Sequence, residues 1–206
     1  MTDLLSELLI LLEESRELGF LGPGPVAAQL SHSECFLPAL DRRQRILDLG
    51  SGGGLPGLVL AVALPESSFL LLDSNLRKCA FLESAIERLG VGNRVQVLTG
   101  RAELLARDAA LRGSCDAVVA RSFGPPAVTA ECALGFMSGP GSILVISEPP
   151  ESHADRWPAL GLELLGLELG KRETHGQGTI QQLQMITALK EKYPRRVGIP
   201  AKRPIF

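Results

Sequence analysis

A short glycine-rich segment that begins with an acid is the part of this sequence best suited to chemistry. It covers Asp48–Gly57 and directly continues the apolar run Arg45–Leu49. Glycines at a switch from strand to helix permit positive φ angles and let backbone amides approach a ligand closely. A tight structural turn would use the same residues, so Gly50, Gly52 and Gly54 alone only weakly indicate a nucleotide site.

Two aspartates indicate which ligand such a loop would hold. Asp48 precedes the first glycine, where a carboxylate would repel a pyrophosphate but attract the ammonium of a methionine-containing cofactor, directly or through water. Asp73 lies 23 residues after Gly50, at the end of the next apolar run. That spacing suits an acid that binds both ribose hydroxyls, although Asp73 could instead cap the helix that follows it. We therefore expect S-adenosylmethionine as the cofactor.

Two later segments offer further contacts at the same edge of the predicted sheet. Ala102 and Glu103 follow the third strand, where they can meet an adenine edge, although Glu103 could simply be a first-turn helix acid. The segment Ala120–Pro126 follows the fourth strand. In it, Arg121 could bind a purine O6 or a phosphate and Phe123 could stack on a base. A surface ion pair and a core aromatic are the alternatives for these two residues.

The elements that must position these residues alternate between strands and helices. The expected strands are Arg45–Leu49, Ser68–Leu72, Arg94–Leu98, Ala117–Ala120 and Ser142–Ile146, and the expected helices between them cover 55–64, 75–89, 103–110 and 126–136. This alternation predicts an α/β fold with a mainly parallel sheet covered on both faces. Two further strands, over 162–169 and 180–189, are joined by the polar segment 171–178 and should form a C-terminal antiparallel hairpin. Two helices, from Thr2 to the break at Gly19 and from Pro25 towards Leu40, precede the first strand.

The length and charge of the chain favour one domain with a basic end. The 206 residues are 45% hydrophobic, enough for a single sizeable core. We divide the domain into an N-terminal helical extension (1–44), a catalytic core (45–189) and a basic, proline-rich tail (190–206). The net charge is −2, yet the tail holds six basic residues and one acidic residue. We expect the tail to lie extended on the surface, where Arg195, Arg196, Lys202 and Arg203 could contact RNA phosphates; a disordered, solvated end is the alternative.

The cysteines and histidines do not have the spacing of a metal site. They are Cys35, Cys79, Cys115, Cys132, His32, His153 and His175. No pair has the close spacing of a zinc or redox motif, so we expect buried thiols and no metal. The apolar stretch Leu8–Leu12 is too short for a membrane span or a signal-peptide core. We expect a cytoplasmic protein, without a membrane partner, that acts as a monomer.

Taken together, the motifs resemble those of a known family, the bacterial small-subunit ribosomal RNA guanine-N7 methyltransferases, also called glucose-inhibited division protein B. The similar segments are Asp48–Gly57, Leu71–Ser74, Gly100–Glu103, Ala120–Phe123 and Tyr193–Pro204. The glycine loop with its Leu-Pro-Gly and the basic tail are the specific parts, while the rest is shared with many methyltransferases. The resemblance covers about Arg45 to Phe206. It implies a Rossmann-like, class I S-adenosylmethionine-dependent fold with a seven-stranded sheet.

The resemblance also implies roles for individual residues. Gly50 and Leu55 would contact S-adenosylmethionine, Ala102 and Glu103 would hold its adenine side, and Arg121 would lie beside it as a catalytic residue. The segment His32–Leu37 departs from the family, because it keeps only the histidine and the later leucine of the usual run. The implied partner is ribosomal RNA or the small ribosomal subunit.

Guanine N7 carries a lone pair and no proton, so its methylation needs no general base. Enzymes that methylate exocyclic amines typically present Asp or Asn before Pro-Pro and an aromatic. The segment Ala120–Pro126 has neither Asp nor Asn at that place. Two rival functions stay open: methylation of a small molecule or a protein, and RNA binding without catalysis. A nicotinamide-dependent reductase is disfavoured by Asp48 and because Tyr193 is the only tyrosine.

Overall fold

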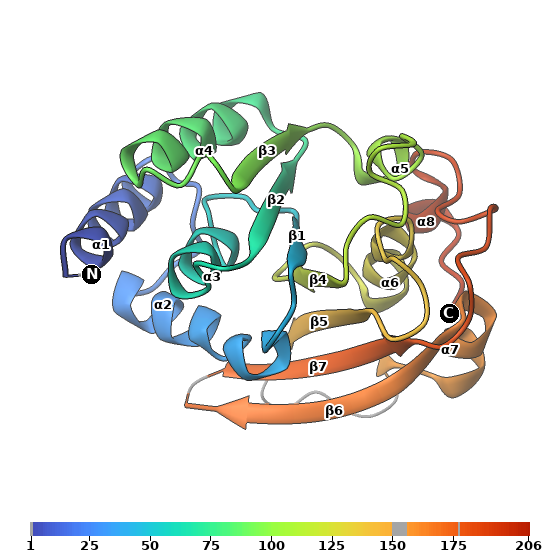
Figure 1. The fold of residues 1–206 in the computed structure, drawn as a ribbon. Coiled ribbons are helices and arrows are strands. Elements are labelled where there is room, and N and C mark those ends of the chain that lie inside the picture. Colours follow the sequence, from blue (N-terminus) through green and yellow to red (C-terminus); the bar gives the residue numbers. More distant parts are fainter. Residues whose placement is uncertain (1, 150–155, 177) are drawn as a thin grey trace.

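A seven-stranded sheet runs through the molecule (Figure 1), whose computed structural model describes residues 2–149, 156–176 and 178–206. The strands are β1 (Arg45–Leu49), β2 (Ser68–Asp73), β3 (Val95–Thr99), β4 (Ala117–Ala120), β5 (Ile143–Glu148), β6 (Leu167–His175) and β7 (Gly178–Met185). Their order is β3-β2-β1-β4-β5-β7-β6. The first five are parallel, and β7 is antiparallel to both β5 and β6. The predicted mainly parallel sheet with a C-terminal antiparallel hairpin is therefore confirmed.

Helices cover both faces of the sheet because successive strand residues point to opposite sides. Ile46 of β1 packs with one layer, and Leu47 packs with the other. The first layer contains α1 (Thr2–Glu17), α2 (Val26–Glu34), α3 (Gly57–Ala63) and α4 (Leu76–Arg88); the second contains α5 (Ala102–Leu105), α6 (Pro126–Leu134), α7 (Ala159–Leu165) and α8 (Ile199–Lys202). The carboxyl ends of β1 to β5 consequently share one edge, at which the predicted site residues should meet.

The predicted second helix is divided in two. Residues 26–34 form α2, and Leu37–Leu40 form a separate 3₁₀ turn. Pro38 lies at the start of this turn, where its missing N–H costs nothing, whereas a continuous α-helix through Pro38 would lose a hydrogen bond.

The prediction of a strand over 162–169 was wrong for most of that range. Residues 159–165 form α7, which ends at Gly166 in the left-handed conformation (φ 77°). Strand β6 begins only at Leu167 and continues through most of the segment predicted to be the connection. Leu167 is the only residue of β6 that is buried, so this edge strand lacks the alternating pattern from which a strand can be predicted.

The prediction of an extended surface tail was also wrong. Tyr193 is buried, the chain turns into α8 at Ile199, and Phe206 packs edge-on against Trp157. Arg112 holds the start of the tail by donating to the backbone oxygens of Tyr193 and Lys190, at 2.9 and 3.2 Å. Buried aromatic surface and arginine donors therefore fold a segment whose composition alone suggested solvation.

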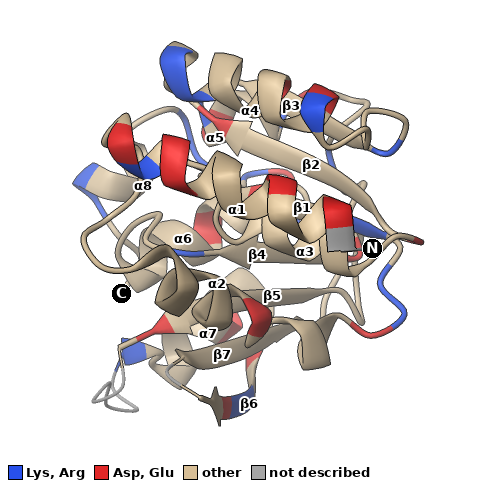
Figure 2. Ribbon diagram, turned by 90° about the vertical axis from the view of Figure 1, so that its left-hand side faces the viewer, with Lys and Arg blue, Asp and Glu red and all other residues tan. Residues whose placement is uncertain are grey.

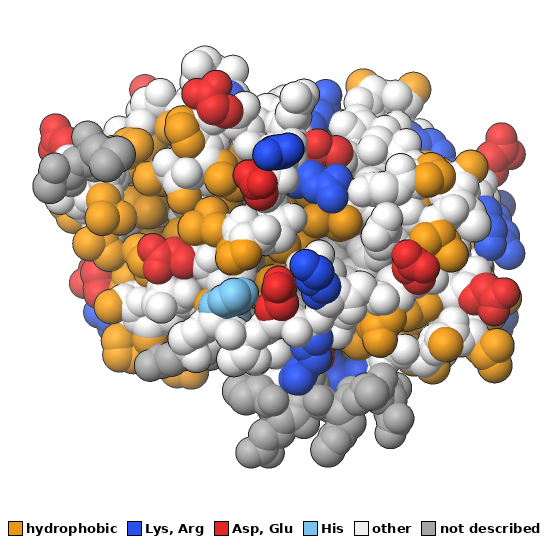
Figure 3. Space-filling view, turned by 60° about the horizontal axis from the view of Figure 1, so that its bottom comes forward, with side chains coloured by type: hydrophobic (Ala, Val, Ile, Leu, Met, Phe, Trp, Pro, Cys, Tyr) orange, Lys and Arg blue, Asp and Glu red, His pale blue; other side chains and the backbone are white. Residues whose placement is uncertain are grey.

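Charges are unevenly placed on the fold. Figure 2 shows several acidic positions along α1 and basic positions near α8, and Figure 1 places these two helices on opposite sides of the molecule. On the face seen in Figure 3, which comes forward from below β6 and β7, acidic and basic side chains are intermingled. Near the tail, Arg196, Lys202 and Arg203 are exposed, so this part of the surface offers positive charge to a polyanion. Within the described part of the chain, no helix is long and apolar enough to cross a bilayer.

Candidate cofactor and acceptor site

At Gly50 the glycine loop makes a close approach that only glycine allows. Gly50 has a φ of 81°, and a Cβ at this position would lie 2.7 Å from Cδ2 of Phe123. The backbone N–H groups of Gly50 and Ser51 both donate to the carbonyl oxygen of Leu72, each at 2.9 Å. The loop after β1 is thereby tied to the end of β2 and lies against the segment after β4.

Asp73 holds the loop from the end of β2. Its Oδ2 accepts from the N–H of Gly52 at 2.8 Å, and its Oδ1 accepts from the N–H of Asn75 at 2.8 Å. The cap of α4 is Asn75, whose side chain accepts from the N–H groups of Arg77 and Lys78. Asp73 is thus not the helix cap, and each of its oxygens keeps acceptor capacity for another donor.

Helix α1 supports the loop from behind. Ser15 is fully buried, and its hydroxyl donates to the carbonyl oxygen of Gly53 at 2.8 Å. A Cβ on Gly53 would collide with this hydroxyl and with Leu21. The N-terminal extension is therefore part of the frame that determines the shape of the loop.

Asp48 lies beneath the loop with no exposed surface. Its Oδ2 accepts from the N–H of Gly57 at 3.0 Å, and its Oδ1 has no hydrogen-bond partner. Burial, helped by the neighbouring charge of Asp73, raises the pKa of Asp48 to about 7, against the opposing hydrogen bonds of Ser51 and Gly57. The orphaned oxygen is suited to a cation above the loop, but the structure also gives Asp48 a purely internal role, joining β1 to the start of α3.

Two adjoining hollows lie at the carboxyl edge of the sheet. The central hollow, of about 390 Å³, is lined by Gly50, Gly52, Leu72, Asp73, Ser74, Lys78, Gly100, Arg101, Ala102, Glu103, Ser122, Phe123, Gly124, Pro125, Val128 and Ala201. The loop hollow, of about 240 Å³, is lined by Phe20, Leu21, Gly22, Gln29, Gly50, Ser51, Gly52, Gly53, Leu55, Lys78, Arg121 and Ser122. Because four residues line both hollows, they form one continuous depression.

Most of the predicted cofactor residues meet in this depression. Gly50, Gly52, Asp73, Ala102 and Glu103 line the central hollow, and Leu55 and Arg121 line the loop hollow. Gly54 and Asp48 line neither, so their direct contact with a ligand stays a prediction.

Sequence reasoning missed Lys78 and Ser122. Lys78 lies in the first turn of α4. The signal that could have identified it is a basic residue in the first turn of the helix that follows the ribose-proximal acid. Ser122 has a φ of 58°, which is rare for a residue with a side chain, and nothing in the sequence indicates this conformation.

Arg121 extends from the end of β4 towards α2. Its guanidinium donates to the carbonyl oxygen of Gln29 at 3.3 Å and lies 3.4 Å from both Ser33 Oγ and Gln29 Oε1. Burial lowers its pKa against the attraction of Asp48, and the guanidinium still carries its charge at neutral pH. These contacts are long, so the guanidinium has donors to spare for a ligand in the loop hollow.

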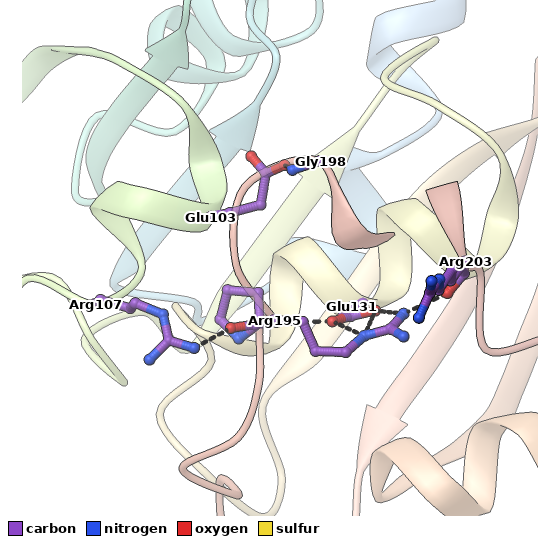
Figure 4. Close-up of polar contacts among 7 residues, drawn as sticks. Glu103, Arg107, Glu131, Arg195, Gly198 and Arg203 are labelled. Atoms are coloured by element: carbon purple, nitrogen blue, oxygen red, sulfur yellow. Dashed lines mark hydrogen bonds and ion pairs between the residues drawn. The ribbon is translucent and has the colours of Figure 1, made fainter. Parts of the chain in front are cut away.

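The tail borders the central hollow on the side of α5. Ala201 lines it, and the N–H of Gly198 donates to Oε1 of Glu103 at 3.0 Å. Burial opposes ionisation of Glu103, but the N–H of Gly198 and the guanidinium of Arg101 outweigh burial and lower its pKa. The predicted adenine-side acid is therefore also the residue that docks the tail (Figure 4).

One ion pair anchors the tail to α6. Glu131 is fully buried, and its two oxygens accept from Nε and Nη2 of Arg195 at 2.6 to 3.1 Å and from the N–H of Arg195 at 2.8 Å. Nη2 of Arg195 also donates to the carbonyl oxygen of Arg203, and Arg107 donates to that of Pro194 (Figure 4). Arg195, predicted as an RNA contact, thus has an internal partner, whereas Arg196, Lys202 and Arg203 are exposed.

The depression fits an adenosine-like cofactor. Asp73 presents acceptor oxygens suited to ribose hydroxyls, and Ala102 supplies apolar surface for a flat ring. Among the described residues, no group of three or more His, Cys, Asp or Glu side chains is placed to hold a metal, and His153 lies outside those residues.

Comparison with solved structures defines the class of protein. The chain superposes on a cofactor-bound protein from MTB with a TM-score of 0.62 (18% identity, 87% of this chain and 89% of that chain). It also superposes on an O-methyltransferase from Bacillus cereus in complex with SAH with a TM-score of 0.61 (16% identity, 87% and 90%). The fold is that of the class I S-adenosylmethionine-dependent methyltransferases, which confirms the predicted class.

Comparison of sequences defines the family. Residues 26–154 match the GidB model, described as rRNA small subunit methyltransferase G. Proteins named ribosomal RNA small subunit methyltransferase G are 35% identical in Syntrophomonas wolfei (89% of this chain, 87% of the relative) and 34% identical in Rubrobacter xylanophilus (98% and 83%). The chain belongs to the GidB family, and it is an S-adenosylmethionine-dependent methyltransferase. The family match begins at residue 26, upstream of the limit at Arg45 that the motifs suggested.

Proposed function

We propose that this protein methylates guanine N7 in small-subunit ribosomal RNA. Membership of the GidB family supports the RNA substrate. The observation that carries the choice of N7 is the end of β4, where Arg121, Ser122 and Phe123 line the depression and no carboxylate or carboxamide stands before Pro125. A lone pair without a proton needs no base at this position.

The residues of the chain have four tasks in this reaction. When bound, S-adenosylmethionine supplies a methyl group on a positively charged sulfur. Asp73 accepts from the ribose hydroxyls, Ala102 and Glu103 border the adenine, and Phe123 contacts the acceptor base. N7 of guanine would offer its lone pair to this methyl group, and the methylated purine would carry the positive charge. Arg121 orients the base through O6 or a phosphate from the loop hollow.

We assign RNA phosphate contacts to the exposed basic side chains of the tail, Arg196, Lys202 and Arg203. They lie close in sequence to Ala201, at the rim of the central hollow. Phosphates bound there would bring a nucleotide towards the cofactor. That Arg195 also contacts RNA stays a prediction, since its guanidinium is paired with Glu131. The proposed substrate places the protein in the cytoplasm; its action as a monomer stays a prediction.

The decisive experiment maps methylated nucleotides. Small-subunit RNA from cells lacking the gene should contain one 7-methylguanosine fewer than RNA from cells that have it, as measured by mass spectrometry. Incubation with the purified protein and S-adenosylmethionine, on RNA or on assembled subunits, should restore that nucleotide. Identical modification maps would contradict the proposal and leave a small-molecule or protein substrate. Failure to bind the cofactor in calorimetry would instead favour an RNA-binding protein without catalysis.

The tail assignment has its own test. Arg196→Ala combined with Lys202→Ala should lower the slope of log K for RNA binding against log salt by about one unit per lost contact. Cofactor affinity should stay unchanged, because neither side chain lines the central hollow. The matched control is Arg42→Ala with Lys171→Ala, two exposed basic residues outside the tail. A salt slope identical to that of the control pair would remove the tail from the RNA interface.

A further inference from the structure

A third hollow, of about 320 Å³, opens next to the central hollow at the ends of β4 and β5. We call it the β5 hollow. Ser122, Phe123 and Gly124 line both hollows, so a group in one is adjacent to a group in the other. A ligand in the β5 hollow would therefore lie next to the cofactor that we assign to the central hollow.

The β5 hollow contains a buried carboxylate at the last position of β5. The Glu148 side chain is 1% exposed. Its Oε1 accepts from Nε1 of Trp157 at 3.1 Å, and its Oε2 lies 2.8 Å from Nε of Arg156. A carboxylate has about four acceptor positions, so these two partners orient Glu148 and balance its charge without using all of its capacity. A buried acid that lines a hollow beside the cofactor site and retains acceptor capacity is suited to a ligand with paired N–H donors.

We propose that the β5 hollow receives the acceptor base and that Glu148 selects guanine by accepting hydrogen bonds from its N1–H and N2–H groups. This inference rests on the proposed function, because it names the contact that recognises that substrate. Trp157 is a positioning residue, which holds the carboxylate through its indole N–H.

The chemistry of the purines supports this assignment. N7 and the N1/N2 pair lie on opposite edges of guanine, so a base that presents N7 to the central hollow can present N1 and N2 to a carboxylate at the far side of the β5 hollow. Adenine carries a lone pair at N1, which a carboxylate repels. A site built for paired donors rejects an analogue that lacks them, because the buried acceptor loses its partners.

The same contact also favours the reaction. Methyl transfer to N7 places a positive charge on the purine, which makes N1–H and N2–H stronger donors. The interaction with Glu148 is therefore stronger in the transition state than in the bound substrate, and only such interactions raise the rate of the chemical step. Glu148 should consequently affect kcat more than KM.

The test uses the nucleotide position identified by the mapping experiment. RNA or reconstituted subunits are prepared with guanosine or with inosine at this position, and inosine lacks only the N2 amino group. The wild-type protein should methylate the inosine form about 10-fold less efficiently, the loss of one hydrogen bond to a charged acceptor. Glu148→Gln should lower kcat/KM on guanine by about 10- to 100-fold, mostly through kcat, and bring the guanine-to-inosine ratio close to one. The matched control is Glu168→Gln, an exposed acid on β6, which should keep the wild-type rate and ratio.

The outcomes separate the two proposals. Equal wild-type rates on guanine and inosine would overturn the recognition proposal while leaving the methyltransferase function intact, and this result does not depend on any variant folding. A lower rate of Glu148→Gln with an unchanged ratio and unchanged cofactor affinity would also overturn it, because a purely structural role lowers both rates equally. Absence of methylation of either form by the wild-type protein would contradict the proposed function itself.

Discussion

The glycine loop (48–57) and the tail (190–206) both border the central hollow, but they are held there in different ways. The loop is held by neighbours in the adjoining strand, since Leu72 and Asp73 accept from its backbone N–H groups. The tail is held by side chains on distant elements, Glu131 of α6 and Glu103 of α5. One wall of the hollow is thus held by backbone hydrogen bonds to the next strand, and another by an ion pair and a hydrogen bond to distant helices.

The largest expected effect concerns the loop and its buried acid. The pKa of Asp48 is raised from 3.8 to about 7 in the folded chain, so the unfolded chain releases this proton at lower pH. The free energy of unfolding should therefore fall by roughly 4 kcal/mol, for this one group, as pH rises from about 4 to about 7. Asp48→Asn, which keeps an oxygen for the N–H of Gly57, should remove this loss.

Urea unfolding of both proteins between pH 4 and pH 8 measures the effect. The exposed Asp41→Asn serves as the control, and its curve should follow that of the wild type. Parallel curves for wild type and Asp48→Asn would show that Asp48 does not titrate in this range.

The next largest effect concerns the anchor of the tail. Glu131→Ala removes the buried partner of Arg195 and should lower the free energy of unfolding by about 3 kcal/mol. Cofactor affinity should fall as well, because Gly198 and Ala201 lose their support beside the central hollow. Urea unfolding and calorimetry with S-adenosylmethionine measure the two effects, with the exposed Glu87→Ala of α4 as the control. Unchanged cofactor affinity in a destabilised variant would show that the tail does not shape the hollow.

The smallest of the three effects concerns the ribose contact. Asp73→Ala should weaken cofactor binding by about 2 kcal/mol, through lost charge-assisted hydrogen bonds. Asp73 also accepts from the N–H of Gly52, so a loss of affinity alone does not identify the ribose contact. We therefore compare the affinities of the wild type and the variant for S-adenosylhomocysteine and for its 2′-deoxy analogue. The wild type should discriminate between the two ligands and the variant should not. Equal discrimination by both proteins would assign Asp73 to loop support alone.

Local patterns were sufficient to predict the half of the fold that carries the loop. The apolar runs of β1, β2 and β4 lie within one residue of their predicted limits, because buried parallel strands are continuous apolar segments. The positions of Gly50 and Asp73 were likewise predictable, since their spacing along one strand-turn-helix unit places them together. The exposed edge strand β6 was not predictable in this way, because its side chains are mostly polar and solvated.

The sequence by itself determined the class of fold, the cofactor and the loop that faces it, because these follow from short-range periodicity, from glycines at a strand end and from the positions of Asp48 and Asp73. Only the tertiary structure decided that the basic tail folds back onto α5 and α6, that Arg195 pairs with Glu131, and that Glu148 is buried beside Phe123. The two tail contacts join residues 64 or more positions apart, and Glu148 and Phe123 come from the ends of different strands. No local pattern specifies which distant partner satisfies a buried charge.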